Sequence, residues 1–310
     1  MRIIAALGGN ALLSRGQPLS AENQVENIKQ AAKALAPIAL QHDLVITHGN
    51  GPQVGLLALQ GQAYKQIATF PLDVLDAETQ GMIGYQIEQA LANVLSTDKR
   101  FATLLTQIEV DGTDTAFRNP SKPIGPAYTR KEAERLADGC GWILKPDGDL
   151  FRRVVPSPLP KRILEIDIIR LLVDQEVIVI CAGGGGIPVI RRQDGSFHGV
   201  EAVIDKDHAS ALLARELEAD ALLMLTDVDA VYTNWNTPDA KAIGRTNPGA
   251  LAGFEFAEGS MGPKVDAGRN FVEQTGGIAG IGRLQDAVAI LNGEAGTMIT
   301  NKAGKIHYRL

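Results

Sequence analysis

The sequence predicts an α/β fold with a mostly parallel central sheet and helices on both of its faces. Short, continuously apolar runs alternate with longer stretches of helical periodicity along most of the chain, as they do in parallel sheets. Three of the apolar runs lead into clusters of glycine, within residues 3–12, 44–55 and 177–189. Three such turns after buried strands indicate phosphate binding at one end of the sheet.

The stretch LVITHGNGPQVG, residues 44–55, is the clearest of the three turns. Gly49 and Gly51 allow a sharp turn and the close approach of another group, and Pro52 suits the first turn of a helix. A strand that ends in such a turn before a helix points backbone N–H groups at an anion. One turn of this kind could need glycine for packing alone, but its repetition favours phosphate binding.

The first half of the chain supplies the beginning of the sheet. A strand is expected at residues 3–7, followed by a helix at 20–40 for which Ser20 is the predicted N-cap. The next elements are a strand at 45–47, helices at 52–66 and 76–95, and a strand at 102–106. Strands that alternate with helices in this way predict parallel pairing.

Residues 112–160 interrupt this alternation and are predicted to form a small insertion that projects from the main sheet. Seven of the fifteen prolines fall within it, and proline at this density does not occur in central strands. Asp147-Gly148 separates two extended stretches, 142–145 and 150–155, which is a β-hairpin signal. A proline-rich linker between two equal domains is the alternative, but the α/β pattern resumes afterwards and favours an insertion.

The second half of the chain completes the predicted sheet. The expected elements are a helix at 163–174, a strand at 177–180, an extended segment at 187–191, a helix at 208–218, a strand at 221–225, helices at 262–274 and 284–291, and a strand at 298–300. Residues 301–310 have the composition of an ordinary surface terminus.

Composition and charge restrict the class of function. The chain has 310 residues, 45% of them hydrophobic and 21% charged, and its formal net charge of −6 with scattered basic residues disfavours a nucleic-acid partner. Cys140 and Cys181 lie outside any CxxC or Cys/His pattern, so neither a disulfide framework nor a zinc site is expected. No signal peptide is visible, and no apolar run approaches the roughly 18 residues of a membrane span. We therefore expect a cytoplasmic protein that acts on small molecules.

Several common catalytic motifs are absent from the sequence. It contains neither GxxxxGK[ST] nor HExxH, and the glycines of GGIAGIG at 276–282 are wrongly spaced for a dinucleotide turn. The five histidines, including His48 and His208, are interpreted as structural or solvent-facing. What remains is phosphate chemistry carried by glycine turns and lysines.

Two lysines are candidate catalytic cations. Lys206 lies between Asp205 and Asp207 just before a predicted helix, and the two carboxylates would hold its ammonium group in one direction, as phosphoryl transfer requires. A solvated alternation of charges would have the same sequence. Lys264, in GSMGPK, is expected on the first turn of a helix, where a cation is unfavourable unless an anion lies nearby. This conflict favours a functional role for Lys264.

Eight motifs carry a family resemblance: LGGNAL at 7–12, HGNGPQVG at 48–55, TQGMIGY at 79–85, NPSKPIG at 119–125, RRVV with a following SP at 152–158, GGGGIPV at 183–189, VIDKD at 203–207 and GSMGPK at 259–264. Through them, essentially the whole chain resembles the carbamate kinases of the amino acid kinase superfamily. The resemblance implies an open αβα sandwich, a small subdomain protruding over the active site, a homodimer, and the reversible reaction of ATP and carbamate to ADP and carbamoyl phosphate.

The resemblance also implies roles for individual residues. The phosphoryl group and carbamate would be held by Gly8, Gly9, Asn10, Gly49, Asn50 and Gly51. Lys206 and Lys264 would neutralise the phosphates with Asp207 orienting them, and Lys122 would reach down from the insertion onto the phosphoryl group. The nucleotide site would consist of Gly184, Gly185, Thr226, Asp227, Tyr232 and Lys264, with Mg²⁺ carried by ATP or ADP rather than by protein ligands. Approximately, residues 1–200 would form the carbamate and phosphoryl side and 201–310 the nucleotide side.

Carbamate is already an anion, so its attack on a phosphoryl group needs positioning and charge neutralisation rather than a general base. Three alternatives remain open. A related kinase acting on a carboxylate, such as an acetylglutamate kinase, should lack the NPSKPIG insertion. A non-catalytic sensor of nucleotide or carbamoyl phosphate would keep the pocket without turnover, but the presence of all three lysines argues against it. A pyridine-nucleotide oxidoreductase is disfavoured by the glycine spacing.

Overall fold

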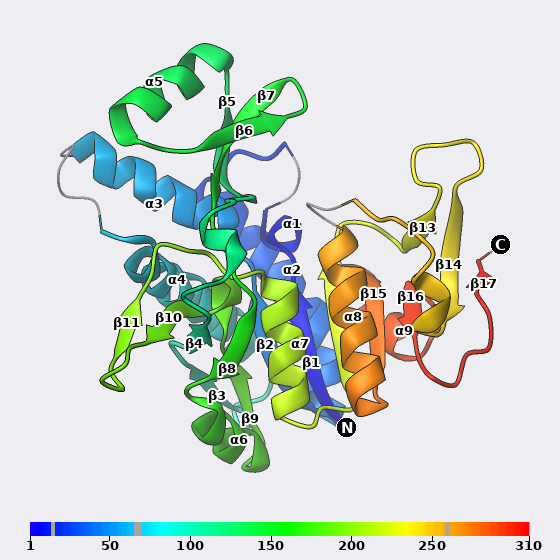
Figure 1. Cartoon of the computed structure of the whole chain (residues 1–310). Helices are drawn as coiled ribbons and strands as arrows, with labels where there is room; N and C mark the ends of the chain where they lie inside the picture. Colours follow the sequence, from blue (N-terminus) through cyan, green and yellow to red (C-terminus); the bar gives the residue numbers. More distant parts are fainter. Residues whose placement is uncertain (14–15, 65–69, 258–260, 310) are drawn as a thin grey trace.

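The computed structural model describes residues 1–13, 16–64, 70–257 and 261–309. In this part of the chain, ten strands form a central sheet in the order β13-β14-β16-β15-β12-β1-β2-β9-β3, with β17 paired to β14 (Figure 1). Their bounds are β1 Arg2–Leu7, β2 Asp43–His48, β3 Arg100–Thr103, β9 Val177–Ile180, β12 Ala221–Thr226, β13 Val231–Thr233, β14 Lys241–Thr246, β15 Ile278–Arg283, β16 Thr297–Ile299 and β17 His307–Tyr308. All neighbours from β15 to β3 are parallel, so the predicted fold class is confirmed.

The sheet is buried between two layers of helices because both faces of its central strands are apolar. In β1, Ile3, Ala5 and Leu7 belong to one core and Ile4 and Ala6 to the other. The first core is covered by α2 Ala21–Gln41, α4 Leu72–Ala92 and α9 Ala287–Leu291, and the second by α6 Ile166–Asp174, α7 Lys206–Glu216 and α8 Met261–Thr275 (Figure 1). Among the described residues, no helix combines the length and the apolar character needed to cross a membrane.

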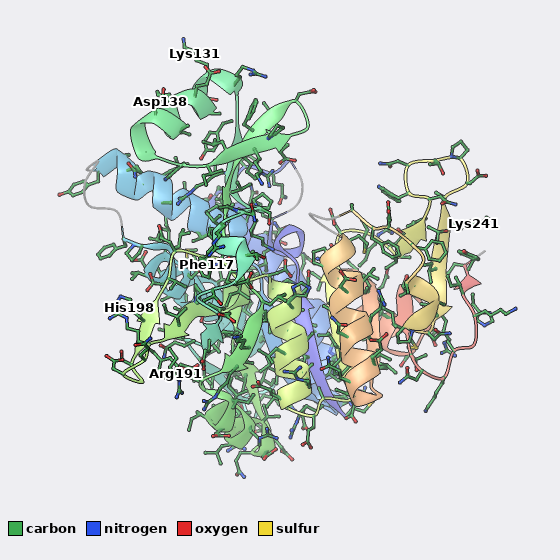
Figure 2. All side chains as sticks on the ribbon, in the orientation of Figure 1. Phe117, Lys131, Asp138, Arg191, His198 and Lys241 are labelled. Atoms are coloured by element: carbon green, nitrogen blue, oxygen red, sulfur yellow. The ribbon has the colours of Figure 1, made fainter. Side chains whose placement is uncertain are left out.

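In the described ranges of the chain, two small sheets lie outside the central one. The first has the order β11-β10-β4-β8, with β4 Gln107–Val110, β8 Pro160–Ile163, β10 Ile187–Arg191 and β11 Phe197–Gly199. The second has the order β5-β7-β6, with β5 Lys122–Tyr128, β6 Leu144–Asp147 and β7 Leu150–Val155, and carries helix α5 Arg130–Cys140. This second sheet and α5, residues 122–155, form a subdomain that lies above the C-terminal ends of the central strands (Figure 1). Figure 2 shows Lys131 and Asp138 on α5, at the end of the subdomain away from the sheet.

The subdomain rests on helix α3 Gly51–Tyr64 through two glycines. A Cβ on Gly55 of α3 would lie 2.0 Å from the Cα of Gly125 in β5, so the two backbones touch. Gly125 has a φ of 71° and lies where the pairing of β5 with β7 shifts register. Both positions therefore need glycine, the first for the close approach and the second for its backbone conformation as well.

The structure corrects several predicted boundaries. α4 begins at Leu72 rather than 76, α7 begins at Lys206 rather than 208, and the predicted helix at 284–291 is a 3₁₀ turn followed by α9. The predicted end of the second helix, at 66, lies outside the described residues. Residues 301–309 are mostly exposed, as expected of a surface terminus, but they also contain β17, which pairs with β14. The elements that were not predicted include helix α5 and strands β4, β5, β8, β11, β13, β14 and β15. The hairpin at Asp147-Gly148 is confirmed as β6 and β7.

Candidate active site

The C-terminal ends of β1, β2 and β9 meet at one edge of the sheet, and a glycine turn follows each of them. β1 leads into Gly8-Gly9, β2 into Gly49-Asn50-Gly51, and β9 is followed by the 3₁₀ turn Gly183–Gly185. The first two turns and Gly184 line one cleft. Its other walls are Lys122–Ile124 of the subdomain, residues 203–207 at the start of α7, and Pro263 and Lys264 at the start of α8.

Contacts between these turns require glycine. A Cβ on Gly49 would lie 3.0 Å from the backbone nitrogen of Gly9, so the first two turns touch. Gly184 has a φ of 67°, and a Cβ on it would lie 2.2 Å from Nδ2 of Asn50. The three turns therefore pack together through backbone atoms and one amide side chain.

The backbone N–H groups of Gly8 and Gly49 are used within the sheet. Gly8 donates to the carbonyl of Leu225 (2.8 Å) and Gly49 donates to the carbonyl of Leu7 (3.0 Å). Helix α1 Gly9–Leu12 begins directly after Gly8, and α3 begins at Gly51, two residues after Gly49. The N–H groups of a first helical turn have no partner inside their own helix. The donors that the turns offer to an anion are therefore those of the helix starts, and Gly8 and Gly49 contribute through their small size.

Asp207 holds two lysines from two helices on one wall of the cleft. It lies in the first turn of α7, where Oδ1 of the N-cap Asp205 accepts from its backbone N–H (2.9 Å). Oδ1 of Asp207 accepts from Nζ of Lys206 (2.8 Å), and Oδ2 accepts from Nζ of Lys264 on α8 (2.9 Å). Because α7 begins at Lys206, this lysine is part of the helix rather than of the loop before it.

The charges of this cluster are strongly coupled. Lys206 is 7% exposed and Asp207 is 4% exposed. Burial acts to raise the pKa of Asp207, but the ammonium groups of Lys206 and Lys264 hold that pKa well below its usual range. Burial lowers the pKa of Lys206, whereas the pKa of Lys264 is raised because the charge of Asp207 outweighs the effect of burial. With two cations and one anion, the cluster is suited to neutralise a bound phosphate.

Lys122 reaches the same cleft from the subdomain, at the first residue of β5. Its Nζ forms an ion pair with Oδ2 of Asp205. The Lys122 side chain is 29% exposed, and the Asp205 side chain is 13% exposed. Burial acts to raise the pKa of Asp205, but the charge of Lys122 makes the net shift downward. Lys122 is thus held over the cleft by a carboxylate of the main body.

A second, more apolar cavity lies on the other side of the start of α8. Met261 lines it, whereas Pro263 and Lys264 line the cleft. The rings of Tyr232 and Trp235 in its wall have centroids 5.1 Å apart, and the Tyr232 hydroxyl donates to Oδ2 of Asp229 (2.9 Å). Aromatic walls of this kind suit stacking on a nucleobase.

The remaining predicted site residues lie at or near these two cavities. Thr226 ends β12 beside Gly8, and its hydroxyl donates to Oδ1 of Asp227 (3.1 Å). Gly185 does not line the cleft: it is buried, and a Cβ on it would lie 2.3 Å from the carbonyl oxygen of Ile204. The side chain of Asn10 and the first two residues of GSMGPK lie outside the described part of the chain.

Two acidic partners were missed as site residues. Asp205 has no predicted role beyond orienting Lys206, although an aspartate before a helix is the signal of an N-cap. Asp76 and Thr79 of α4 both accept a hydrogen bond from Nδ2 of Asn50, at 2.8 Å each. Thr79 opens the TQGMIGY motif, but nothing in the local sequence marks Asp76.

His48 has the structural role that the sequence predicts. It ends β2, is 1% exposed, and its Nδ1 donates to the carbonyl of Gly49 (3.2 Å). Burial lowers its pKa to about 4, so the ring is neutral near neutral pH. Its hydrogen bond lies within the turn, and it therefore supports the turn rather than supplying charge to the cleft.

Comparisons with known proteins show the family to which the chain belongs. Residues 1–281 match the amino acid kinase family. The carbamate kinase of Rhizobium meliloti (strain 1021) is 55% identical over 312 residues, covering 100% of this chain and 96% of that protein. The chain belongs to the carbamate kinases of the amino acid kinase family. The carbamate kinase of Haemophilus influenzae is 57% identical over 308 residues and covers 99% of both chains. The structure of the Giardia lamblia carbamate kinase bound to AMP-PNP has a TM-score of 0.87 at 42% identity, with 96% of this chain and 98% of that chain covered.

Proposed function

We propose that this protein catalyses the reversible reaction of ATP and carbamate to ADP and carbamoyl phosphate, and that it makes ATP from carbamoyl phosphate in the breakdown of nitrogen compounds. One observation carries the proposal. Lys122, Lys206 and Lys264 come from the subdomain, α7 and α8, and all three line the cleft formed by the glycine turns. A kinase whose glycine turns and three lysines line one cleft has the groups that phosphoryl transfer requires.

The chemistry of carbamate explains why the cleft needs no general base. The attacking oxygen of carbamate carries no proton, so catalysis consists of alignment and neutralisation of charge on the transferred phosphoryl group. Gly9, Asn10 and Gly51 would offer backbone N–H groups to the phosphoryl group and carbamate, while Gly8, Gly49 and Asn50 shape the pocket around them. His48 is not among the described residues that line the cleft, and its Nδ1 is hydrogen-bonded to the carbonyl of Gly49, so it is not placed to act as a base on the substrate.

Each lysine has its own part in this proposal. Lys206 and Lys264, oriented by Asp207, neutralise the charge that the phosphates bring into the cleft. Lys122 exchanges Asp205 for the phosphoryl group when substrate binds, because a phosphate carries more negative charge than one carboxylate. The subdomain, residues 122–155 within the predicted insertion 112–160, would therefore act as a catalytic arm over the main body.

The nucleotide would bind beside the cleft, with its base in the apolar cavity of Tyr232 and Trp235 and its phosphates near Thr226, Asp227 and Lys264. Gly184 and Gly185 would support the phosphate end of this site. Asp205 and Asp207 already pair with lysines, so the donor set fits an Mg²⁺ ion that is held by the nucleotide phosphates rather than by protein carboxylates. Bound in this way, Mg²⁺ supplies further neutralisation of phosphate charge.

The proposal also covers the oligomeric state of the chain and the division of the site between its two halves. The chain is proposed to work as a homodimer in the cytoplasm, on small molecules and without nucleic acid. Residues 1–200 would supply mainly the carbamate and phosphoryl side, and residues 201–310 mainly the nucleotide side.

The experiment is an assay of ATP formation from ADP and carbamoyl phosphate with Mg²⁺ present. We expect ATP well above the amount formed during spontaneous decay of carbamoyl phosphate without enzyme. In parallel, N-acetylglutamate is offered with ATP, and no ADP above background is expected. No ATP from carbamoyl phosphate would contradict the proposed function, and ADP formed with N-acetylglutamate would favour the related kinase instead.

A further inference from the structure

Asp76 is a buried aspartate beneath the cleft that the chemistry described above does not use. It lies in α4 with an exposure of 0%. Its Oδ1 accepts a hydrogen bond from Nδ2 of Asn50 (2.8 Å), whereas its Oδ2 is buried and has no hydrogen-bond partner among the described residues. A buried carboxylate oxygen without a partner is costly when the group is charged, and much less so when it is a neutral acid.

The surroundings of Asp76 are acidic. Asp73 lies in the same turn of α4, and Glu201 approaches the start of this helix, where its Oε2 accepts from the backbone N–H of Leu72 (2.6 Å). Burial raises the pKa of Asp76 well above its usual range, the hydrogen bond from Asn50 opposes this shift, and the charges of Asp73 and Glu201 add to it. Geometry and charge therefore both favour the neutral acid.

Asn50 connects Asp76 to the cleft. It lines the cleft, its carbonyl accepts from the N–H of Val54 at the start of α3 (2.9 Å), and its side chain packs against Gly184. The amide NH₂ group has two hydrogens, and Nδ2 has two acceptors on α4, Oδ1 of Asp76 and Oγ1 of Thr79. The orientation of the Asn50 side chain is thus set from α4.

We propose that Asp76 is a positioning residue that acts as a neutral carboxylic acid and fixes Asn50, and with it the Gly49–Gly51 turn, for phosphoryl transfer. As a neutral acid, it accepts through its carbonyl oxygen and adds no negative charge beneath a cleft that binds anions. The inference rests on the proposed function, because Asn50 acts there as part of the carbamate and phosphoryl site.

The test compares Asp76→Asn and Asp76→Ala with the wild type and with Asp73→Asn as the matched control. The amide of Asp76→Asn retains a carbonyl acceptor for Asn50, so the kcat of this variant should stay within about threefold of the wild type. Asp76→Ala removes the acceptor and leaves the Asn50 side chain unfixed, so this variant should lose at least about tenfold in kcat/KM for carbamoyl phosphate. The KM for ADP should not change in any variant. Asp73→Asn should behave as the wild type.

A stability measurement tests the protonation state without activity. When folding raises the pKa of an acid, the unfolded state loses its proton first as the pH rises above the ordinary pKa, so the free energy of unfolding falls. An amide at the same position does not titrate and causes no such fall. The stability of Asp76→Asn relative to the wild type should therefore increase between about pH 4 and about pH 7. Denaturant unfolding at several pH values measures this change.

Opposite outcomes overturn the inference. A folded Asp76→Asn that is as impaired as Asp76→Ala would show that the negative charge is needed, and a relative stability of Asp76→Asn that falls with rising pH would show an ionised Asp76. If Asp76→Ala does not fold, the activity and the pH-dependent stability of Asp76→Asn alone decide whether the inference is correct. If the wild type makes no ATP, the proposed function fails, and the stability comparison still decides whether Asp76 is the neutral partner of Asn50.

Discussion

The cleft is bounded by two regions that hold their cations in different ways. In the main body, Lys206 and Lys264 share the buried carboxylate of Asp207, and both ammonium groups have a fixed hydrogen bond before substrate arrives. In the subdomain, Lys122 is more exposed and pairs across to Asp205 on the main body. The difference indicates that the body supplies preorganised charge, whereas the subdomain supplies a charge that substrate binding can redirect.

The largest effect is expected from removing a fixed cation. Lys206→Ala and Lys264→Ala should each lower the turnover of ATP formation by roughly 10²- to 10³-fold, the loss typical of one preorganised donor. Lys206→Met and Lys264→Met repeat the test with a side chain of similar length, and Lys29→Ala on the surface of α2 is the control. Turnover near that of the wild type in any of the four folded variants would mean that the lysine concerned does not stabilise the transferred phosphoryl group, and the proposed contrast between the two regions would be wrong.

The next largest effect concerns the contact between the regions. Gly55→Ala places a Cβ 2.0 Å from the Cα of Gly125, so the subdomain has to move away from α3. We expect a loss of about 1–3 kcal/mol in the free energy of unfolding, as in other overpacked sites, together with reduced turnover. The control is Gly81→Ala in α4, where an added Cβ meets nothing within 4 Å. This variant should gain about 0.5–1 kcal/mol in the free energy of unfolding, because alanine is favoured over glycine inside a helix. Equal stabilities of these two variants would show that the Gly55–Gly125 contact does not set the position of the subdomain.

The smallest effect is expected from the movable cation. Lys122→Ala should lose at least about tenfold in turnover, a smaller loss than for the fixed donors because Lys122 must first leave Asp205. Lys131→Ala is the matched control, since Lys131 belongs to the same subdomain but lies at its far end (Figure 2). Unchanged turnover in Lys122→Ala would remove the subdomain from the catalytic mechanism.

The glycine turns and lysines of the cleft could be predicted because each belongs to a short local motif. The pairing of Lys122 with Asp205 could not, because it joins residues 83 positions apart and depends on how the subdomain rests on α3. Asp76 was missed for the same reason: its role depends on a contact with Asn50, 26 positions away.

Helix α5 was missed although its local signals are present. Thr129 and Glu132 form a capping box at its start, and Gly141 with a φ of 66° ends it. The prolines around this segment directed the interpretation towards a hairpin alone. Strand β13 has only three residues, and the six residues of β14, KAIGRT, include two charged ones and are only partly buried. Neither strand therefore has the continuous apolar run that is typical of the central strands.

Calorimetric titration of ADP into Lys122→Ala and Lys264→Ala tests the difference between the two regions most directly. If Lys264 is a fixed part of the nucleotide-phosphate site, Lys264→Ala should bind ADP at least about tenfold more weakly than the wild type, a loss of about 1.4 kcal/mol in binding free energy. If Lys122 acts only on the transferred group, Lys122→Ala should bind ADP as the wild type does. A loss of ADP affinity in Lys122→Ala as large as that in Lys264→Ala would place both lysines in one nucleotide site and contradict the account.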